Sequence, residues 1–185
     1  HVEVHRKPLG VVAAISPWNF PVLIAAYKLA PAVLAGNTVI VKPAATTPLT
    51  TLWLGELAAD LFPAGVVNVI ADRNDLGAAL SQHSDVAKVT FTGSTATGKR
   101  VMQAAADTLK RLTLELGGND PAILLDDIEV DAVSRKVFDA AFNLSGQVCT
   151  AVKRVYVPRA QYDAVCERLG AIARSAKVGD GLDED

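Results

Sequence analysis

The sequence contains few cysteines, little net charge and no long apolar run. Two cysteines among 185 residues are too few for a disulfide framework, and free thiols are typical of the reducing cytoplasm. The formal net charge is only -2 and no long basic block is present, so there is no electrostatic reason to expect nucleic-acid binding. No apolar run reaches the ~20 residues of a membrane span. These absences predict a cytoplasmic protein that acts on a small molecule, without a nucleic acid or a membrane as partner.

Ligands for a metal ion are also scarce. Three histidines and two scattered cysteines show no metal-ligand spacing, and we predict no metal site. The chain begins with His1 rather than Met, and its first residues, HVEVHRK, have the composition of neither a signal nor a transit peptide. Its last residues, KVGDGLDED, contain no helix stop and no final strand. Half of the residues are hydrophobic, which is enough for one full core, but we expect a fragment of a longer protein.

Short runs rich in Val and Ile alternate with Ala- and Leu-rich segments of helical period. This alternation predicts βαβ units, and therefore an α/β fold with a doubly wound parallel sheet. We expect five strands, at 9–15, 38–42, 66–70, 88–92 and 111–116. Helices are expected between them, near 21–35, 48–61, 75–82 and 96–109.

A second alternation follows the pair Gly117-Gly118. Here the expected strands are 122–125 and 154–157, and the expected helices lie near 129–142 and 159–175. Neither an internal repeat nor a low-complexity linker is present. We predict two domains, 1–116 and 117–185.

The stretch FTGSTATGKR (91–100) raises the possibility of a phosphate site. Gly93, Gly98 and Lys99 match a nucleotide-triphosphate loop, but Arg100 occupies the place of the hydroxyl that would meet magnesium. The stretch follows an expected strand and opens an expected helix, so its amides can meet a phosphate of any nucleotide. Two interpretations stay open: a phosphate cradle, or glycines that only make a tight turn. AILLDD, with Asp126, resembles the magnesium strand of an NTPase, although Asp commonly ends strands.

Two polar residues follow expected strands in the first domain. Asn19 lies in SPWNFP, a turn stiffened by Pro17 and Pro21, and its amide can donate to an oxyanion without carrying a charge. Alternatively, Asn19 caps the following helix. Lys42 ends TVIVK, at the sheet edge where open α/β folds bind ligands, but a solvated surface lysine is equally compatible with this position.

A carboxylate and a thiol complete the set of candidate reactive groups. Glu115 lies between Leu114 and Leu116. If these leucines surround the carboxylate, they would desolvate it and make it a better base. The alternative is a Glu115 side chain that faces outward. Cys149, in GQVCTA, is expected in an accessible loop and is the candidate nucleophile. Cys166 lies in an amphipathic run, and we expect it to be a small buried hydrophobe.

Five segments occur in one order: PWNFP, GNTVIVKPA, FTGSTATG, LELGG and GQVCTA. With these segments the chain closely resembles the NAD(P)-dependent aldehyde dehydrogenase family over essentially its whole length. The resemblance implies an atypical Rossmann domain for NAD(P), followed by the first part of a catalytic domain that belongs to a longer, homo-oligomeric enzyme. It also implies that the loop beginning at Gly93 approaches the cofactor pyrophosphate without needing a magnesium hydroxyl.

Carried over to this sequence, the resemblance implies three catalytic roles. Cys149 is the nucleophile that forms a thiohemiacetal and then a thioester with the aldehyde. Asn19 and the Cys149 backbone N–H donate to the oxyanion. Glu115 activates the water that releases a carboxylic acid, and its presence favours hydrolysis over transfer of the acyl group to coenzyme A.

The resemblance also implies the cofactor contacts. Lys42 is expected near the adenosine ribose, Ser94 near the phosphates and Leu116 as a backbone contact to the nicotinamide. The other matching positions are Trp18, Gly93 and Gly98.

Two positions depart from the family pattern. Where NAD-preferring members carry a Glu that holds the ribose, this chain has Ala45, which removes the repulsion of a 2′-phosphate and leaves Lys42 to pair with it. We therefore expect NADP to be accepted as well as NAD. The segment ADRND (71–75) replaces a Gly-containing loop near the adenine.

Two alternative functions remain on the sequence alone. A P-loop NTPase would use 93–99 and Asp126 but would leave Asn19, Glu115 and Cys149 without a role. A non-catalytic relative would be expected to have lost the thiol or the base, and both are present. The aldehyde is not identified by the sequence, although Phe20, Val148 and Thr150 predict a partly apolar mouth for it.

Overall fold

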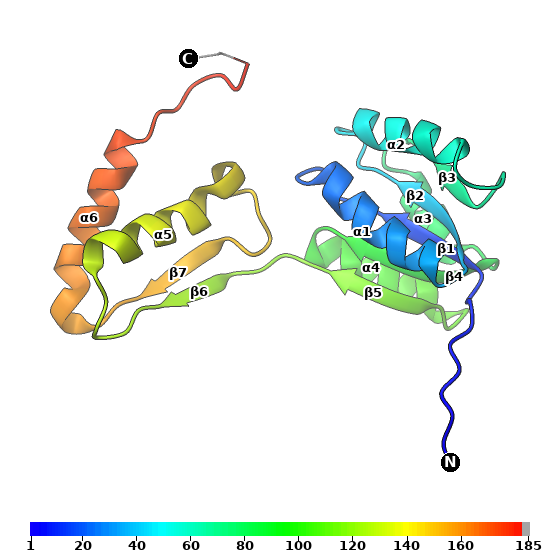
Figure 1. The fold of residues 1–185 in the computed structure, drawn as a ribbon, viewed down its shortest axis with the longest axis horizontal. Helices are drawn as coiled ribbons and strands as arrows, with labels where there is room; N and C mark the ends of the chain where they lie inside the picture. Colours follow the sequence, from blue (N-terminus) through cyan, green and yellow to red (C-terminus); the bar gives the residue numbers. More distant parts are fainter. Residues whose placement is uncertain (183–185) are drawn as a thin grey trace. The chain divides into compact units, whose positions relative to one another are not determined.

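The computed structural model describes residues 1–182, which form two compact units. The first unit comprises His1–Gly117 and the second begins at Gly118 (Figure 1). No helix among the described residues has both the length and the apolar character needed to cross a membrane.

The first unit is built on a five-stranded sheet in which every pair of neighbouring strands is parallel. Its strands are β1 (Val11–Ile15), β2 (Thr38–Lys42), β3 (Val67–Val69), β4 (Val86–Thr92) and β5 (Arg111–Glu115). They lie in the order β3-β2-β1-β4-β5. The prediction of an α/β fold with a doubly wound parallel sheet is confirmed, and all five expected strands are present.

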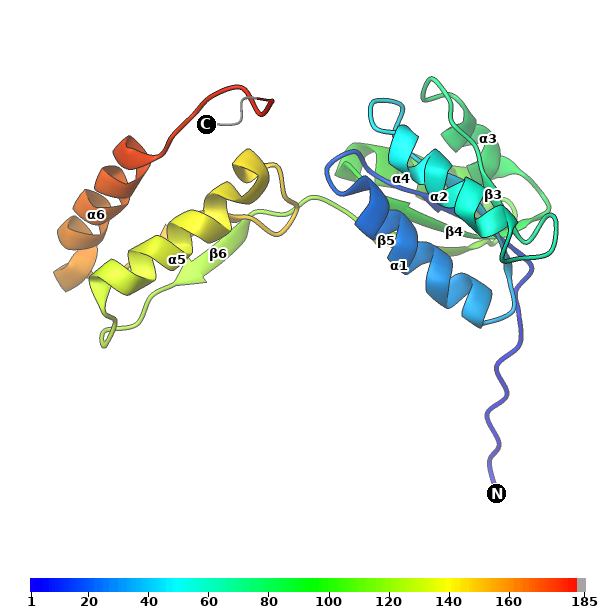
Figure 2. The ribbon, with the colours of Figure 1, turned by 45° about the horizontal axis from the view of Figure 1, so that its top comes forward.

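Helices cover both faces of this sheet. They are α1 (Pro21–Leu34), α2 (Leu49–Ala59), α3 (Leu76–Gln82) and α4 (Thr95–Ala106). In Figure 1, α1 lies in front of the sheet and α4 behind it, and Figure 2 shows α1 and α2 side by side.

The central strand β1 is buried on both of its faces, which explains why its sequence, VVAAI, is apolar without alternation. Val12 and Ala14 pack in a cluster with Ala25 of α1 and residues of β2. Ala13 and Ile15 belong to the cluster on the opposite face, which includes Val101 of α4. The strand therefore joins two apolar layers into one core.

The strand order places a topological switch point beside β1. The chain leaves β1 toward β2 on one side, whereas β4 pairs with β1 on the other side. The loops that follow β1 and β4 thus diverge, and ligands of open α/β sheets bind in the crevice at this point. The candidate residues Asn19 and Ser94 lie in these two loops.

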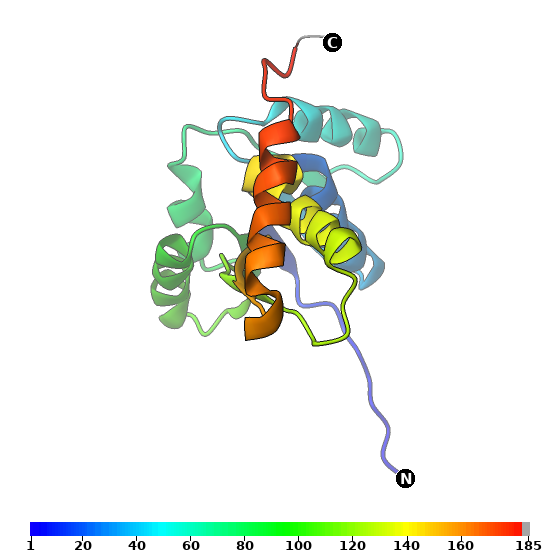
Figure 3. The same cartoon turned by 90° about the vertical axis from the view of Figure 1, so that its left-hand side faces the viewer.

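The second unit contains a parallel pair of strands, β6 (Asp120–Ile123) and β7 (Val152–Tyr156). Its α-helices are α5 (Val130–Phe142) and α6 (Tyr162–Ser175), with the 3-10 helices η1 (Asn143–Gly146) and η2 (Arg159–Gln161) preceding β7 and α6. In Figure 3, α6 stands in front; it packs against α5.

Both strands of the second unit begin two residues before the expected position. The sequence-based prediction took the runs AILL and RVYV as the strands, but backbone pairing already starts at Asp120 and Val152. The expected helix at 159–175 is also divided, because its first turn is the 3-10 helix η2.

Candidate active site

Most of the predicted site residues lie at the carboxyl edge of the five-stranded sheet. Trp18 and Asn19 follow β1, Lys42 ends β2, and Glu115 ends β5. Ser94 follows β4 and precedes α4. Cys149 belongs to the second unit, in the loop between η1 and β7. Five parallel strands thus bring four separate segments of the first unit to one edge.

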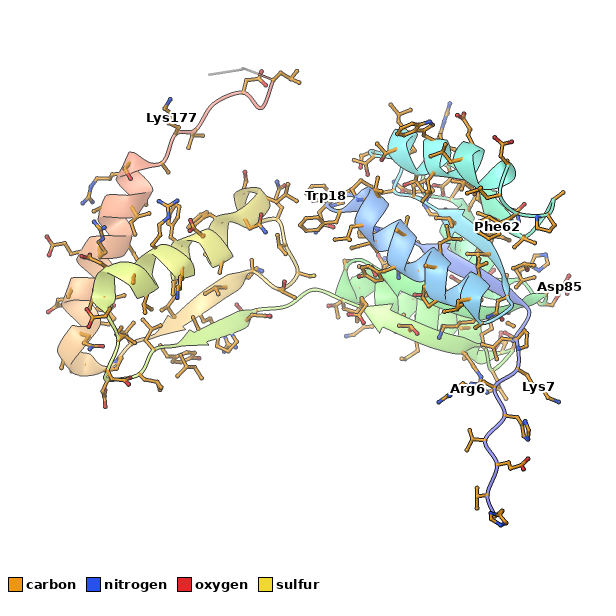
Figure 4. The ribbon with its side chains drawn as sticks, in the orientation of Figure 1. Arg6, Lys7, Trp18, Phe62, Asp85 and Lys177 are labelled. Atoms are coloured by element: carbon orange, nitrogen blue, oxygen red, sulfur yellow. The ribbon has the colours of Figure 1, made fainter. Side chains whose placement is uncertain are left out.

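The loop that carries Trp18 and Asn19 is attached to its neighbours through the backbone. The amide of Ser16 donates to the carbonyl oxygen of Lys42 over 2.9 Å, and Thr47 Oγ1 donates to the carbonyl oxygen of Trp18 over 3.3 Å. Pro21 opens α1 and Phe20 is its N-cap residue, so Asn19 lies one residue before the cap. The Trp18 side chain is 47 % exposed beside the first turn of α1 (Figure 4).

The N-terminus of α4 is a candidate site for the cofactor phosphates. Ser94 is its N-cap, and its Oγ accepts a hydrogen bond from the Thr97 amide over 3.2 Å. The cap does not use the backbone N–H groups of Thr95 and Ala96, in the first turn of the helix, so they can donate to a ligand. Such amides, together with the helix dipole, favour an anion.

Two glycines allow close packing around this helix end. A Cβ added to Gly98 would lie 2.5 Å from Leu116 Cδ2, so the absence of a side chain lets α4 approach the segment that follows β5. A Cβ on Gly93 would lie 2.5 Å from the ring of Phe91. Close helix–strand packing is one of the glycine roles in dinucleotide-binding folds, and the arrangement fits a pyrophosphate at this edge.

The same geometry disagrees with a nucleotide-triphosphate loop. The helix begins at Thr95, so Gly98 and Lys99 lie inside α4 rather than in a loop before it. Asp126, the candidate magnesium ligand, follows β6, which pairs with β7 in a separate sheet from β4. Within residues 1–182 no group of three His, Cys, Asp or Glu side chains is arranged to hold a metal ion.

Lys42 forms a buried ion pair that the sequence did not reveal. Its Nζ lies 2.6 Å from Asp72 Oδ1, and the two side chains are only 6 % and 1 % exposed. Burial by itself would raise the pKa of the Asp72 carboxyl, but hydrogen bonds from Lys42 and the Leu76 amide, with the Lys42 charge, hold that pKa below its usual value. Asp72 is part of ADRND, a segment that appeared in the sequence only as a departure from the family pattern.

Lys28, in α1, is a second buried lysine that was missed. Its Nζ donates to Thr90 Oγ1 over 2.9 Å. Burial lowers the pKa of Lys28 to about 8, the nearby charge of Glu115 opposes this shift, and Lys88 adds to it. Lys28 and Glu115 line one cavity of about 820 Å³. A lysine on an amphipathic helix is normally solvated, and nothing in the local sequence marks this one as buried.

The surroundings of Glu115 differ from one of the two expectations. The side chain is exposed at the end of β5, whereas Leu114 and Leu116 pack against the apolar cluster that contains Val101. Successive strand residues point to opposite faces, so the leucines do not cover the carboxylate. The outward-facing alternative is the one observed.

In the loop around Cys149 the thiol is exposed, and the backbone that precedes it is strained. Leu144 and Ser145 have left-handed φ angles of 49° and 55°, a conformation that costs about 1–2 kcal/mol for each non-glycine residue. The next residue, Gly146, also has a positive φ angle, of 78°. Cys149 then lies in a turn closed by the Ala151 amide, which donates to the Val148 carbonyl oxygen over 3.2 Å. Strain of this kind often occurs at functional sites.

Two contacts hold this turn in place. Lys153 Nζ donates to the carbonyl oxygens of Val148 and Ala151 over 3.0 Å and 3.4 Å, so both ends of the turn share one ammonium group. A Cβ on Gly118 would lie 2.6 Å from the Cys149 carbonyl oxygen. The second glycine of LELGG therefore makes room for the backbone that carries the thiol.

A hollow of about 620 Å³ lies beside this turn and is lined by residues that include Phe138, Phe142, Val148 and Thr150. The two phenylalanine rings are in contact, with their centroids 4.8 Å apart and their planes tilted by 32°. The two rings give the hollow one apolar side, which suits the non-reacting part of an organic substrate, and the polar side chains of Asp139 and Asn143 line it as well.

The expectation for Cys166 was wrong. Cys166 is exposed, whereas its neighbour Val165 is 1 % exposed and Ile172, two turns later, is also buried. The buried stripe of α6 thus passes through Val165, and Cys166 lies beside it. A hydrogen bond with Cys166, one helical turn away, contributes to raising the pKa of Tyr162.

A doubly wound parallel sheet with a phosphate-binding helix end at its switch point is typical of dinucleotide-binding α/β folds. Residues 1–185 match the aldehyde dehydrogenase family along their whole length, and the chain belongs to this family. It is 49 % identical over 184 residues to phenylacetaldehyde dehydrogenase of Pseudomonas fluorescens, covering 98 % of this chain and 37 % of the relative. It is 45 % identical over 183 residues to the mitochondrial aldehyde dehydrogenase of Leishmania tarentolae, with 97 % and 37 % covered.

Solved structures agree with this assignment. Aldehyde dehydrogenase from Brucella melitensis biovar abortus 2308 superposes with a TM-score of 0.91 at 44 % identity, over 96 % of this chain and 37 % of the other. The NAD⁺ complex of aldehyde dehydrogenase from Bacillus cereus gives a TM-score of 0.93 at 40 % identity, over 97 % and 37 %. The chain therefore spans just over a third of the length of these relatives.

Proposed function

We propose that the whole protein oxidises an aldehyde to a carboxylic acid with NAD or NADP, and that Cys149 is its nucleophile. The observation that carries the proposal is an exposed thiol in a constrained turn of a chain that belongs to the aldehyde dehydrogenase family. In this proposal residues 1–116 bind the cofactor, and residues 117–185 begin the catalytic domain.

The first unit has residues that fit the cofactor. The amides of Thr95 and Ala96 with Ser94 would hold the pyrophosphate, and Lys42 would meet the adenosine ribose. The remaining contacts with the cofactor would come from Trp18, Gly93, Gly98 and Leu116. When bound there, the nicotinamide would supply the hydride acceptor that oxidation of the substrate carbon requires.

The chain's own groups perform the addition step. The Cys149 thiolate attacks the aldehyde carbon, a C–S bond forms, and the carbonyl oxygen becomes an oxyanion. The Asn19 side-chain amide and the Cys149 backbone N–H donate hydrogen bonds to this oxyanion, and one such donor contributes ~3 kcal/mol to the transition state.

Hydrolysis then releases the acid. After oxidation the acyl group is a thioester on Cys149. Glu115 accepts a proton from water as the water oxygen attacks the acyl carbon, the C–S bond breaks, and the thiolate leaves. The exposure of Glu115 at the end of β5 supports this role, because a general base that activates water has to be reachable by water.

The proposed substrate is an aldehyde with an apolar body. The hollow lined by Phe138 and Phe142 supports an aromatic group, and one close relative is named for phenylacetaldehyde. Val148 and Thr150 also line this hollow, and we propose Phe20 as a separate apolar contact for the substrate. We further propose a cytoplasmic homo-oligomer, which size-exclusion chromatography with light scattering of the full-length protein tests.

Absorbance of the reduced nicotinamide, measured on the full-length protein, tests the proposed reaction. The panel contains phenylacetaldehyde, benzaldehyde and linear aliphatic aldehydes, each with NAD and NADP. We expect turnover with at least one aromatic aldehyde and none in the Cys149→Ser variant. A folded protein that is inactive with every aldehyde and both cofactors would overturn the proposal.

A further inference from the structure

The end of β2 carries an unusual charge for a dinucleotide site. In such folds an acidic side chain near the second strand holds the ribose hydroxyls and repels a 2′-phosphate, whereas a basic one accommodates that phosphate. This chain has Lys42 at the end of β2 and Ala45 three residues later. On sequence alone, position 42 therefore attracts a 2′-phosphate and position 45 does not oppose it.

The structure adds a carboxylate to this position from the loop that follows the neighbouring strand β3. Asp72 lies in the loop between β3 and α3, and its Oδ1 accepts from Lys42 Nζ over 2.6 Å. Its Oδ2 accepts from the Leu76 amide over 2.9 Å. Both carboxylate oxygens are thus engaged, and the Asp72 side chain is 1 % exposed. Asp72 is fixed by α3 and in turn fixes the lysine.

The pairing changes what Lys42 can offer a ligand. An ammonium has three N–H donors, and two of them are used by Asp72 Oδ1 and by the Pro43 carbonyl oxygen, 3.2 Å away. One donor remains, which suits a single hydroxyl. The positive charge is balanced by a carboxylate in direct contact, so a dianionic phosphate gains little attraction here and approaches a negative partner.

We propose that Asp72 is a positioning residue that makes the cofactor site prefer NAD over NADP. It acts through Lys42 in two ways. Its carboxylate balances the positive charge of the ammonium, and the pairing leaves one oriented N–H of Lys42 for a ribose hydroxyl. Ala45 leaves space for a 2′-phosphate, and Asp72 removes the attraction that would draw it in. This inference rests on the proposed function, since it concerns the same cofactor site.

Fluorescence titration of the full-length protein with NADH and NADPH, without aldehyde, tests the inference directly. We expect the unaltered protein to bind NADH at least roughly tenfold more tightly than NADPH, which corresponds to about 1.4 kcal/mol. In Asp72→Asn the neutral amide oxygen still accepts from Lys42, but the positive charge of the ammonium is no longer balanced by a carboxylate. The preference should then shrink by roughly tenfold, mainly through tighter NADPH binding.

Asp75→Asn is the matched control, because Asp75 is an exposed carboxylate in the same loop that makes no contact with Lys42 among the described residues. Steady-state kinetics supply a second readout: the KM ratio of the two cofactors should change in Asp72→Asn while kcat at saturating NAD does not. A merely structural role of Asp72 would weaken both cofactors equally.

The outcomes separate the two proposals. Binding of neither cofactor by the unaltered protein would overturn the proposed function together with this inference. Equal binding of NADH and NADPH by the unaltered protein would overturn the inference alone, even if Asp72→Asn failed to fold. An unchanged preference in a folded Asp72→Asn variant would do the same.

Discussion

The two regions assigned to chemistry are built in opposite ways. At the carboxyl edge of the first unit, functional groups are held by burial and by partners: Lys42 is paired with Asp72, and Ser94 caps α4. Around Cys149 in the second unit, the reactive side chain is exposed and the backbone before it is left-handed. A binding surface for a fixed ligand benefits from rigid, satisfied groups, whereas a nucleophile has to be accessible.

The two exposed cysteines should differ in function although they are alike in exposure. Cys149→Ser should lower turnover by several orders of magnitude, because a serine hydroxyl without an adjacent base is a poor nucleophile. Cys166→Ser is the matched control and should keep normal activity. Initial rates with the preferred aldehyde check both variants. Equal losses in the two variants would contradict the role of Cys149.

Glu115→Gln should slow hydrolysis of the thioester without slowing the oxidation step that precedes it. Loss of a general base typically costs 10²–10⁴-fold, and here the cost should fall on hydrolysis of the thioester. Rapid mixing should show one fast equivalent of reduced cofactor per site, followed by slow turnover. Glu167→Gln, in α6, is the control and should turn over normally. Absence of the fast phase would instead assign Glu115 to the first step.

Lys28 should make the first unit sensitive to pH. Its pKa is lowered from 10.5 to about 8 by burial, so the unfolded chain binds more protons between these pH values and the free energy of unfolding rises with pH there. Below pH 8 both states are charged and the cost of the buried charge is constant. Relative to Lys28→Met, the unaltered protein should therefore gain a few kcal/mol between pH 8 and 10.5.

Chemical denaturation of the full-length protein across this pH range measures that difference. Lys99→Met is the control, because Lys99 is exposed on α4 and its removal should leave the pH dependence unchanged. Parallel pH profiles of the Lys28→Met variant and the unaltered protein would show that Lys28 remains charged in the folded state.

The two glycines of LELGG should respond differently to alanine. A Cβ at Gly118 would meet the Cys149 carbonyl oxygen at 2.6 Å, whereas one at Gly117 has nothing within 4 Å. Gly118→Ala should lower the free energy of unfolding by about 1–3 kcal/mol and reduce kcat by displacing the Cys149 turn. Gly117→Ala should be close to neutral. Thermal unfolding and initial rates measure both effects, and equal behaviour of the two variants would refute the packing argument.

The secondary structure was largely predictable because its signals are local. The apolar runs of β1 and β2 and the helical period after Pro21 each depend on neighbours within a few residues. The shifted starts of β6 and β7 show the limit of this signal: a strand begins where its backbone finds a partner, and that partner is distant in sequence.

The α/β class, the parallel sheet and the candidate nucleophile were predictable, since they follow from periodicity and from motifs that occur in one order. The partner of Lys42, the burial of Lys28 and the exposure of Cys166 become visible only in the folded chain. The physical reason is that burial and ion pairing depend on which segments the sheet brings together. Asp72 lies 30 residues from Lys42 in the chain, and the two side chains meet because β2 and β3 are neighbours that end at the same edge.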